Sequence, residues 1–364
     1  MGLNNNIFAK SLNHLTINAC KDLLKHGIHQ ETRNGGAKAL YDVNIRLQNP
    51  RARHLCLKGR TNNIFATLGE IFWVMAGDDR INPYLSFFIP RAKNYSDDGK
   101  TWYSAYGKRL WDYKQFEHVF DLFKNDGLYT RRATQSIFLP HTDTYDEYSK
   151  RTQGSIKDIA CNQWINYFVI PSTDTTPNLL CMKVATRSND CIFGLSNINV
   201  PEFTLIQEFV LQHLQAMYKD KVIEMGTYIQ SITNLHIYDF TLKQGENIIQ
   251  NLDENVELTK QSNDDNHKCV FPEKLNEVKD FFKCLVENFS ILIQDKRTQK
   301  NTEKIFDDFK LQKENNLLYA YALLVEKYIL NKQELEDNIT LPRLPKGLEN
   351  SIRFSSFRNF DFEY

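Results

Sequence analysis

The stretch LCMKVATRSNDCIFGLSNINVPEF, residues 180–203, joins an apolar run to a helix through a polar turn. The apolar run is short and β-prone, which predicts a strand. A proline then opens an amphipathic helix over residues 201–218, because proline suits the first helical turn. An arginine, a hydroxyl and a carboxylate lie between the two, at Arg187, Ser188 and Asp190. Three such groups at one strand end need partners, so this turn is harder to explain as ordinary core than any other stretch of the chain.

The rest of the chain shows both helix and strand patterns. Helices are predicted over residues 1–30, 62–77, 115–125, 201–218, 273–294 and 302–333, mainly from apolar residues at helical spacing. Strands are predicted over residues 131–140, 162–171, 179–188, 225–240 and the tail 351–364. Residues 243–268 are polar and predicted to be rich in loops.

The composition limits the kinds of partner. The 364 residues are 41% apolar and 25% charged, as in a globular protein, and 45 basic residues balance 45 acidic ones. No overall charge attracts nucleic acid, so an anionic ligand must be held by local arginines. No apolar run reaches the roughly 20 residues of a membrane span, and the N-terminus lacks a signal pattern. The seven cysteines have no C-x-x-C spacing, which indicates reduced thiols in a cytoplasmic protein rather than a disulfide frame or a zinc site.

Two single residues stand out, and each also has an ordinary interpretation. Cys161 begins a predicted strand, where a lone cysteine is more often a packing residue than a nucleophile. Glu70 lies in a nearly apolar helix, where an unpaired carboxylate is costly unless it turns to solvent or forms an ion pair.

Two pairs of residues are equally ambiguous when taken alone. Arg131 and Arg132 are adjacent and could be an ordinary solvated pair. His236 and Tyr238 are two apart in a predicted strand, so they point to one face, where they could form a core pair. The order of all these features along the chain is more informative than any one of them.

That order resembles the thymidylate synthase family, which includes the pyrimidine nucleotide hydroxymethylases. The family reads Glu-x-x-Trp-x-x-x-Gly, then Tyr-Gly-Lys, an arginine pair, a cysteine, Arg-Ser-x-Asp followed by Gly-Leu, and His-x-Tyr. The matching residues here are Glu70, Trp73 and Gly77; Tyr106; Arg131 and Arg132; Cys161; Arg187, Ser188, Asp190, Gly194 and Leu195; and His236 and Tyr238. The turn TRNGG at Arg33 resembles the arginine-bearing phosphate loop of the family.

The resemblance implies an α/β (α+β) fold with a large twisted mixed or antiparallel sheet packed by helices. It places a catalytic domain at residues 31–242 and 341–364, after an N-terminal helical segment at residues 1–30. Residues 243–340 have no counterpart in the family and are predicted to form a helical insertion. Two subunits would pack sheet to sheet as a homodimer, because the family donates its arginine pair across the interface.

The resemblance also implies folate-dependent one-carbon transfer to position 5 of a pyrimidine nucleoside 5′-monophosphate. Cys161 would add to position 6 of the base as the nucleophile, with Arg187 lowering its pKa. Glu70 would order water and relay protons, and Tyr106 would help to remove the proton at position 5. The one-carbon donor would be 5,10-methylenetetrahydrofolate, with no metal.

The binding roles follow from the same resemblance. Forked guanidinium groups bind phosphate well, so four arginines and a serine are expected around the nucleotide phosphate. The expected phosphate ligands are Arg33, Arg187, Ser188 and, from the partner subunit, Arg131 and Arg132; His236 and Tyr238 would hold the sugar hydroxyl, and Asp190 and Trp73 the folate.

The base-reading position departs from the family pattern. Where synthases have an asparagine that reads the uracil edge, this chain has Ile198, with Asn197 and Asn199 on either side. A slip of one residue would exchange which side chain points to the base. Ala160 and Asn162 also replace the proline and histidine that usually flank the cysteine. Uracil and cytosine both remain possible bases, and ribose and deoxyribose both remain possible sugars.

Two further departures bear on the product. The tryptophan-rich stretch before Tyr-Gly is missing, and the sequence stops after FRNFDFEY, residues 357–364. In synthases a further segment closes over the folate and excludes water. Without it, water would capture the methylene group, which favours hydroxymethylation. Two alternatives remain: thymidylate synthase proper, with residues 243–340 as the lid, and a catalytically silent nucleotide-binding scaffold, which would have no need for the thiol.

Overall fold

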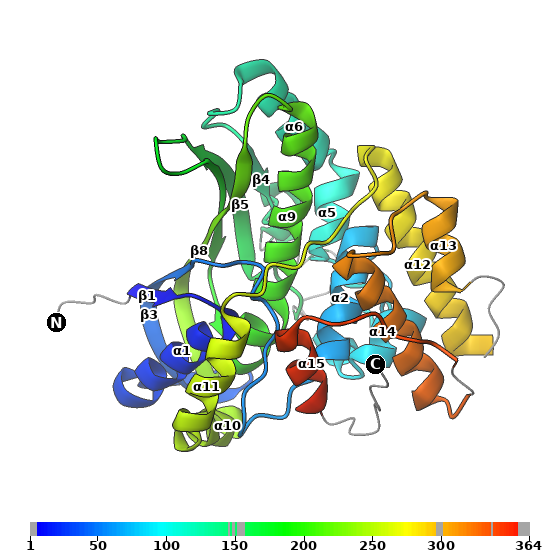
Figure 1. Ribbon diagram of the computed structural model, residues 1–364. Helices are drawn as coiled ribbons and strands as arrows, with labels where there is room; N and C mark the ends of the chain where they lie inside the picture. Colours follow the sequence, from blue (N-terminus) through cyan, green and yellow to red (C-terminus); the bar gives the residue numbers. More distant parts are fainter. Residues whose placement is uncertain are drawn as a thin grey trace.

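The structure is a computed structural model that describes residues 6–144, 146–147, 150, 157–295, 301–335 and 338–355. Its centre is a mixed sheet of eight strands, which runs in the order β1-β3-β8-β6-β5-β4, with β2 paired to β3 and β7 paired to β8 (Figure 1). The strands are β1 (Asn6–Ala9), β2 (Ile28–Thr32), β3 (Gly35–Leu47), β4 (Thr134–Ser136), β5 (Asn162–Ile170), β6 (Asn178–Thr186), β7 (Asn189–Asp190) and β8 (Ile223–Tyr238). The predicted fold class, a large mixed sheet packed by helices, is confirmed.

Three of the sheet pairings position the site. β6 and β8 are parallel neighbours, and β5 lies antiparallel on the other side of β6. The short strand β7, directly after β6, continues beside β8 and sets Asp190 opposite His236. The end of β6, the start of β5 and the end of β8 therefore meet at one edge of the sheet.

Helices cover one face of the sheet, with α1 (Leu12–His26) against β3 and α9 (Val200–Met217) against β6 and β8. The opposite face carries exposed apolar side chains, among them Phe8, Trp164 and Ile170. The remaining helices up to α9 are α2 (Ile64–Ala76), η1 (Ile81–Leu85), α3 (Ser86–Phe88), α4 (Ala92–Tyr95), α5 (Tyr106–Asp112), α6 (Gln115–Asp126), α7 (Pro140–Asp143) and η2 (Cys191–Asn199). η1 and η2 are π-helical.

The helix α2 has the start and the end that its sequence predicts. The Asn63 side chain accepts a hydrogen bond from the backbone N–H of Ala66, which caps the first turn. Gly77 follows the last turn with a φ of 66°, a left-handed conformation that favours glycine. All but one of the residues of α2 are buried, and the exception is Glu70, which is partly buried.

The segment 243–340 is helical but begins differently from the prediction. The polar stretch 243–268 was predicted to be loop-rich, but most of it is helical. It includes the larger part of α10 (Asp239–Gln250) and all of α11 (Leu252–Ser262), which pack on α1. Their few apolar residues are enough to pack against a neighbouring helix, and this packing stabilises them. A polar local sequence gives no sign of such a contact, so the helices were not predicted. The predicted helix 273–294 corresponds to α12 (Leu275–Asp295).

Two further predictions differ from the structure. The single helix expected over 302–333 is two, α13 (Thr302–Asp308) and α14 (Leu317–Lys332), because Lys310 and Asn315 adopt positive φ between them. The tail predicted as a strand begins instead with the helix α15 (Lys346–Arg353), and residues 356–364 lie outside the described residues. Within residues 1–30 the helix α1 is flanked by β1 and β2.

The helices α12 and α14 lie on the side of α2 that faces away from the sheet (Figure 1). Phe65 of α2 stacks on Tyr328 of α14, with ring centroids 4.2 Å apart, and Phe72 of α2 contacts Phe282 and Phe289 of α12. α2 is therefore enclosed between two helical layers. Within the described ranges, no helix combines the length and the apolar character that a membrane span requires.

Candidate functional site

A cavity of about 280 Å³ opens at the sheet edge where β5, β6 and β8 meet. Its walls come from the turn after β2, from α2 and α5, from the segment before β5 and from η2. Eleven of the fourteen predicted site residues line it: Arg33, Glu70, Trp73, Tyr106, Cys161, Arg187, Ser188, Asp190, Asn199, His236 and Tyr238. Side chains that are far apart in the sequence thus face one space, which we call the main cavity.

Cys161 sits just before β5 and is half-buried. Burial raises the pKa of its thiol, and Asp158 adds to that rise, while the positive charges of Arg187 and Arg33 lower the pKa. The arginines therefore act in the predicted direction, but burial outweighs them and the net shift is upward. Desolvation disfavours the thiolate here more than the two charges favour it.

The two arginines also hold the segment that carries the cysteine. Arg187 donates through Nε to the carbonyl of Ala160 (3.1 Å) and through Nη2 to that of Ile159 (2.9 Å). Arg33 Nη2 donates to the carbonyl of Lys157 (3.1 Å). Beside the main cavity, Arg33, Lys157 and Arg187 line a second hollow together with Ser188 and other polar residues. Three cationic side chains around one opening suit an anionic ligand.

The opposite wall of the main cavity carries an acid and a phenol in an apolar setting. Burial within α2 raises the pKa of Glu70 to about 8, so its carboxyl group retains its proton near neutral pH. Tyr106 begins α5, and burial together with the nearby thiol raises the pKa of its hydroxyl. The Tyr106 hydroxyl is therefore neutral near pH 7.

Asp190, His236 and Tyr238 form the third wall. Asp190 caps η2, because its carboxylate accepts the backbone N–H groups of Ile192 (3.2 Å) and Phe193 (3.0 Å). The His236 ring is hydrogen-bonded to the Asn234 side chain (3.0 Å) and lies edge-on to the Tyr238 ring. Burial lowers the pKa of His236, while Asp190 opposes that shift, so the imidazole is neutral near pH 7.

Aromatic rings line the outer part of the main cavity. Trp73 and Trp102 lie with ring centroids 5.9 Å apart, and the Trp73 indole N–H donates to the carbonyl of Arg80 (2.9 Å), which fixes its orientation. The Arg91 guanidinium lies 4.2 Å above the Phe193 ring. Flat apolar surfaces of this kind suit a planar heterocyclic ligand. Among the described residues, no group of three histidine, cysteine or carboxylate side chains is arranged to hold a metal ion.

The structure separates the two asparagines at the base-reading position. Asn199 lines the main cavity together with Ile198, whereas Asn197 is buried beneath it and lines a neighbouring hollow. Asn197 accepts a hydrogen bond through its backbone carbonyl from Thr67 of α2 (2.7 Å). Residues two apart in a helical turn point to roughly opposite sides, so only Asn199 reaches the wall of the main cavity.

The arginine pair does not contribute to this subunit's cavity. Arg132 is exposed and forms an ion pair with Asp126 (Nε to carboxylate, 2.7 Å), and Arg131 is exposed beside it. Both precede β4 at one end of the sheet. Neither lines the main cavity.

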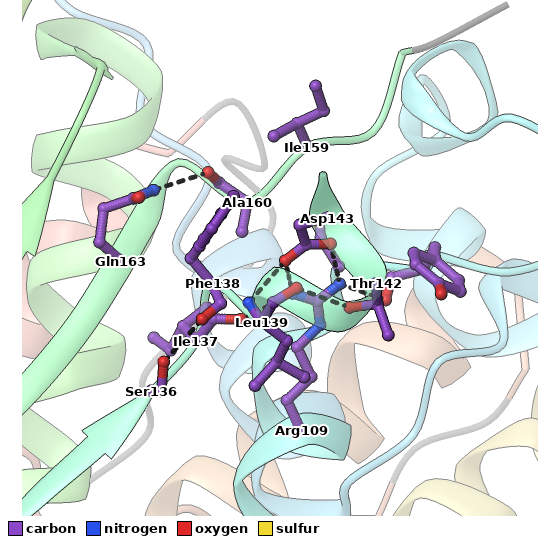
Figure 2. A network of polar contacts seen from close by, with 12 residues as sticks. Arg109, Ser136, Ile137, Phe138, Leu139, Thr142, Asp143, Ile159, Ala160 and Gln163 are labelled. Carbon is purple, nitrogen blue, oxygen red and sulfur yellow. Dashed lines mark hydrogen bonds and ion pairs between the residues drawn. The ribbon is translucent and has the colours of Figure 1, made fainter. Parts of the chain in front are cut away.

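A buried polar network holds α5 and the cysteine segment in place (Figure 2). The Arg109 side chain, in α5, forms an ion pair with Asp143 and donates to the carbonyls of Ile137 (2.6 Å) and Tyr103 (3.1 Å). Figure 2 also shows Gln163, whose amide donates to the carbonyl of Ala160 (3.1 Å). The network ties the start of α5, where Tyr106 lies, to the strands beside Cys161.

Several residues of the site were not predicted. Asp158 is buried and accepts the backbone N–H of Ser104 (3.0 Å) as well as its hydroxyl, which joins the cysteine segment to the approach to α5. Lys157 and Arg91 line the cavity as cations. Asp158 lies three residues before Cys161, so its position near the thiol was a usable signal, while Arg91 had no distinguishing pattern.

Several known proteins are similar in sequence to this chain over most of its length. The chain is 33% identical over 345 residues to the deoxyuridylate hydroxymethyltransferase of Delftia phage PhiW-14, a match that covers 92% of this chain and 91% of that protein. It is 28% identical to the deoxyuridylate hydroxymethyltransferases of Bacillus phage SP01 and Pseudomonas phage M6, over 62% and 60% of this chain and 57% of each relative. No family model matches the chain. Because the first match covers 92% of the chain, it includes most of the helical segment 243–340.

Proposed function

The chain belongs to the family of the deoxyuridylate hydroxymethyltransferases, and we propose that it adds a hydroxymethyl group to position 5 of deoxyuridine 5′-monophosphate. The observation that carries this proposal is the convergence of a thiol, two arginines, a carboxyl and a phenol on one cavity, at Cys161, Arg33, Arg187, Glu70 and Tyr106. A module that only binds a nucleotide has no use for the thiol or for a buried carboxyl that retains its proton.

The chemistry proceeds through a covalent adduct at Cys161. Its sulfur adds to C6 of uracil, and C5 then has the electron density to attack a one-carbon unit. Loss of the C5 proton, together with cleavage of the bond between the one-carbon unit and the folate nitrogen, releases tetrahydrofolate and leaves an exocyclic methylene group. The oxygen of water then bonds to that methylene carbon, water gives up a proton, and the sulfur leaves C6. In sum, deoxyuridylate, methylenetetrahydrofolate and water give 5-hydroxymethyldeoxyuridylate and tetrahydrofolate.

Protons at the base would pass through Glu70 and Tyr106. Charge develops on the C4 oxygen when the sulfur adds to C6, and a carboxyl with a pKa of about 8 can donate a proton there and recover it later. The neutral Tyr106 hydroxyl can relay the proton that leaves C5. Since burial raises the pKa of Cys161 in the protein alone, its thiol would keep its proton until the sulfur adds to C6, when that proton passes to an acceptor in the cavity.

The nucleotide would be oriented by the arginines at one end and by Asn199 at the other. Arg33 and Arg187, with Ser188, would bind the phosphate, and His236 and Tyr238 would bind the sugar. Uracil presents an N–H donor at N3 and an oxygen acceptor at C4. The carboxamide of Asn199 offers a matching acceptor and donor on one planar group.

The one-carbon donor would be 5,10-methylenetetrahydrofolate, bound against the aromatic wall. Trp73, Trp102 and Phe193 offer apolar surface for its ring system, and Asp190 lies at the junction with the nucleotide end. Among the described residues of segment 243–340, none lines the main cavity. The described helices of this segment pack behind α1 and α2, which argues against the alternative that they form a lid.

A homodimer would complete the phosphate site. Arg131 and Arg132 are exposed and lie outside the cavity of their own subunit. The uncovered face of the sheet carries exposed Phe8, Trp164 and Ile170, which a second subunit would bury. Packing of two such faces would bring the arginine pair of one subunit to the phosphate of the other.

The test is mass spectrometry of the nucleotide after incubation with methylenetetrahydrofolate and, in separate reactions, dUMP, dCMP, UMP and CMP. We expect a hydroxymethyl adduct with dUMP, and its loss in Cys161→Ala with nucleotide binding retained. Cys284→Ala is the matched control, because Cys284 is a partly buried thiol on α12, away from the cavity. A methyl product would identify a synthase instead, and nucleotide binding without any product would indicate a silent binding protein.

A further inference from the structure

The imidazole of His236 is the last member of a series of hydrogen-bonded side chains beside the main cavity. Gln30 and Asn234 line the second hollow together with His236. The Asn234 side chain bonds the His236 ring through Oδ1 (3.0 Å to Nδ1) and the Gln30 side chain through Nδ2 (3.3 Å to Oε1). The Tyr41 hydroxyl donates to the same Gln30 oxygen (2.5 Å). We call Tyr41, Gln30, Asn234 and His236 the amide network.

The pairing of the strands brings the amide network together. Tyr41 of β3 lies directly opposite Asn234 of β8 in an antiparallel pair. Gln30 belongs to β2, which pairs with β3 along its other edge. Asn234 and His236 are two apart on β8, so their side chains share a face. The network is therefore held by the sheet itself.

The direction of each hydrogen bond follows from Tyr41. A separation of 2.5 Å fits an O–H···O bond and is too short for N–H···O, so the Gln30 oxygen, not its nitrogen, faces the phenol. An amide oxygen only accepts, so Asn234 turns its NH2 group to Gln30 and its own oxygen to His236. An oxygen that faces Nδ1 requires a proton there. The neutral His236 ring is then left with a lone pair on Nε2.

Tyr238 complements the histidine with a donor. Asn34, in the turn after β2, donates through Nδ2 to the Tyr238 hydroxyl oxygen (3.2 Å). The phenolic proton is then available for a ligand. The rings of His236 and Tyr238 lie edge to face with centroids 4.7 Å apart, and both residues line both hollows. One acceptor and one donor thus lie side by side.

We propose that Asn234 and Gln30 are positioning residues that fix the tautomer of His236, so that the site takes a sugar hydroxyl and rejects a group that only accepts hydrogen bonds. This inference rests on the proposed function, in which His236 and Tyr238 bind the sugar. Deoxyuridine 5′-monophosphate has one free sugar hydroxyl, at position 3′. That hydroxyl would donate to Nε2 of His236 and accept from the hydroxyl of Tyr238. A site built in this way discriminates against a ligand that leaves its polar groups unpaired.

The experiment measures the binding of dUMP and of its 3′-fluoro-3′-deoxy analogue by calorimetry, without folate. Fluorine is close in size to a hydroxyl but has no proton to donate, so the Nε2 lone pair of His236 would face it unpaired. We expect wild type to bind dUMP at least about tenfold more tightly than the analogue. In Gln30→Met and Asn234→Leu the ring proton can move to Nε2. Both variants should bind dUMP about three- to tenfold more weakly, and their preference over the analogue should fall below about threefold.

Gln215→Met is the matched control. The Gln215 side chain, in α9, donates to the carbonyl of Ile223 (2.7 Å) and lines neither hollow. Both nucleotides should bind this variant as they bind wild type. A variant that only loosened the sheet would weaken both nucleotides by the same factor and leave their ratio unchanged. A wild-type preference below threefold, or a wild-type ratio retained in Gln30→Met and Asn234→Leu, would therefore overturn the proposal.

Nitrogen-15 NMR of the histidine rings reads the tautomer in the protein without nucleotide, which separates this proposal from the proposed function. The His236 signals are those that His236→Gln removes. We expect the wild-type proton on Nδ1, and a shift of that proton toward Nε2 in Gln30→Met and Asn234→Leu. A wild-type proton on Nε2, or no change in either variant, would overturn the proposal even where the enzyme forms product. Failure of wild type to bind dUMP would instead refute the proposed function, and the NMR result would then decide the role of the amide network.

Discussion

Removing either partner of the buried Arg109–Asp143 ion pair should destabilise the folded protein by several kcal/mol, whereas removing both should cost less than the two single losses combined. The side chains are 5% and 0% exposed. Arg109→Met would leave the Asp143 carboxylate buried, with the backbone N–H of Leu139 (2.9 Å) as its remaining hydrogen-bond donor. It would also leave the carbonyls of Ile137 and Tyr103 without the donors they now have. Removing one partner of a buried pair typically costs about 3–5 kcal/mol.

Urea denaturation of Arg109→Met, Asp143→Leu and the double variant would measure this. Each single variant should lose about 3–5 kcal/mol in the free energy of unfolding, whereas the double variant should recover much of that loss, because no unpaired charge remains. Since α5 begins at Tyr106, the single variants should also lower kcat more than they weaken nucleotide binding. Single variants that cost under 1 kcal/mol, or a double variant as unstable as both singles combined, would refute this account of the network.

Three further predictions test the packing, the base contact and the titration. A Cβ on Gly107 would lie 1.9 Å from the carbonyl oxygen of Val74, so Gly107→Ala should push α5 away from α2. The variant should lose about 1–3 kcal/mol in the free energy of unfolding, measured by urea denaturation, and should have a lower kcat. An unchanged urea midpoint would contradict this. Asn199→Leu should reduce kcat/KM for dUMP about 10- to 100-fold, since an unpaired polar group costs about 1–3 kcal/mol. Asn197→Leu should instead lower the free energy of unfolding more than it changes the kinetics. The reverse pattern would assign the base contact to Asn197. The pKa of Glu70 is raised to about 8 in the folded protein, against 4.5 when unfolded, so the free energy of unfolding should fall by at most about 5 kcal/mol between those pH values. Glu70→Gln should make the plot of unfolding free energy against pH flatter from pH 5 to 8. The same plot for variant and wild type would show that Glu70 ionises normally.

The sequence was most informative where local chemistry and spacing act together. Arg187, Ser188 and Asp190 follow a strand directly, so a strand prediction alone placed all three at one sheet edge. His236 and Tyr238 share a face because side chains alternate along a strand. These positions depend only on the period of the backbone, and the structure brings all five to the main cavity.

Prediction was weaker where a position depends on the packing of distant segments. No sequence pattern distinguished Asn197 from Asn199, because which of them reaches the cavity depends on how η2 packs against the rest of the fold. The polar helices α10 and α11 pack on α1, which lies more than 200 residues earlier in the chain. The net pKa of Cys161 depended on how deeply the thiol is buried, which outweighed the nearby arginines. Each of these is set by tertiary contacts rather than by local propensity.

The all-apolar character of α2 explains why the helical segment 243–340 is present. A helix that is apolar all round must be buried all round, yet the sheet side of the fold can cover only one face of α2. The helices α12 and α14 cover the other, through Phe282, Phe289 and Tyr328. Between these layers the Glu70 side chain lines the main cavity, and burial raises its pKa to about 8. The segment 243–340 therefore affects the site indirectly, by keeping the surroundings of Glu70 apolar. A variant that loosens the packing of α12 and α14 on α2 should lower the Glu70 pKa while nucleotide binding is still unchanged.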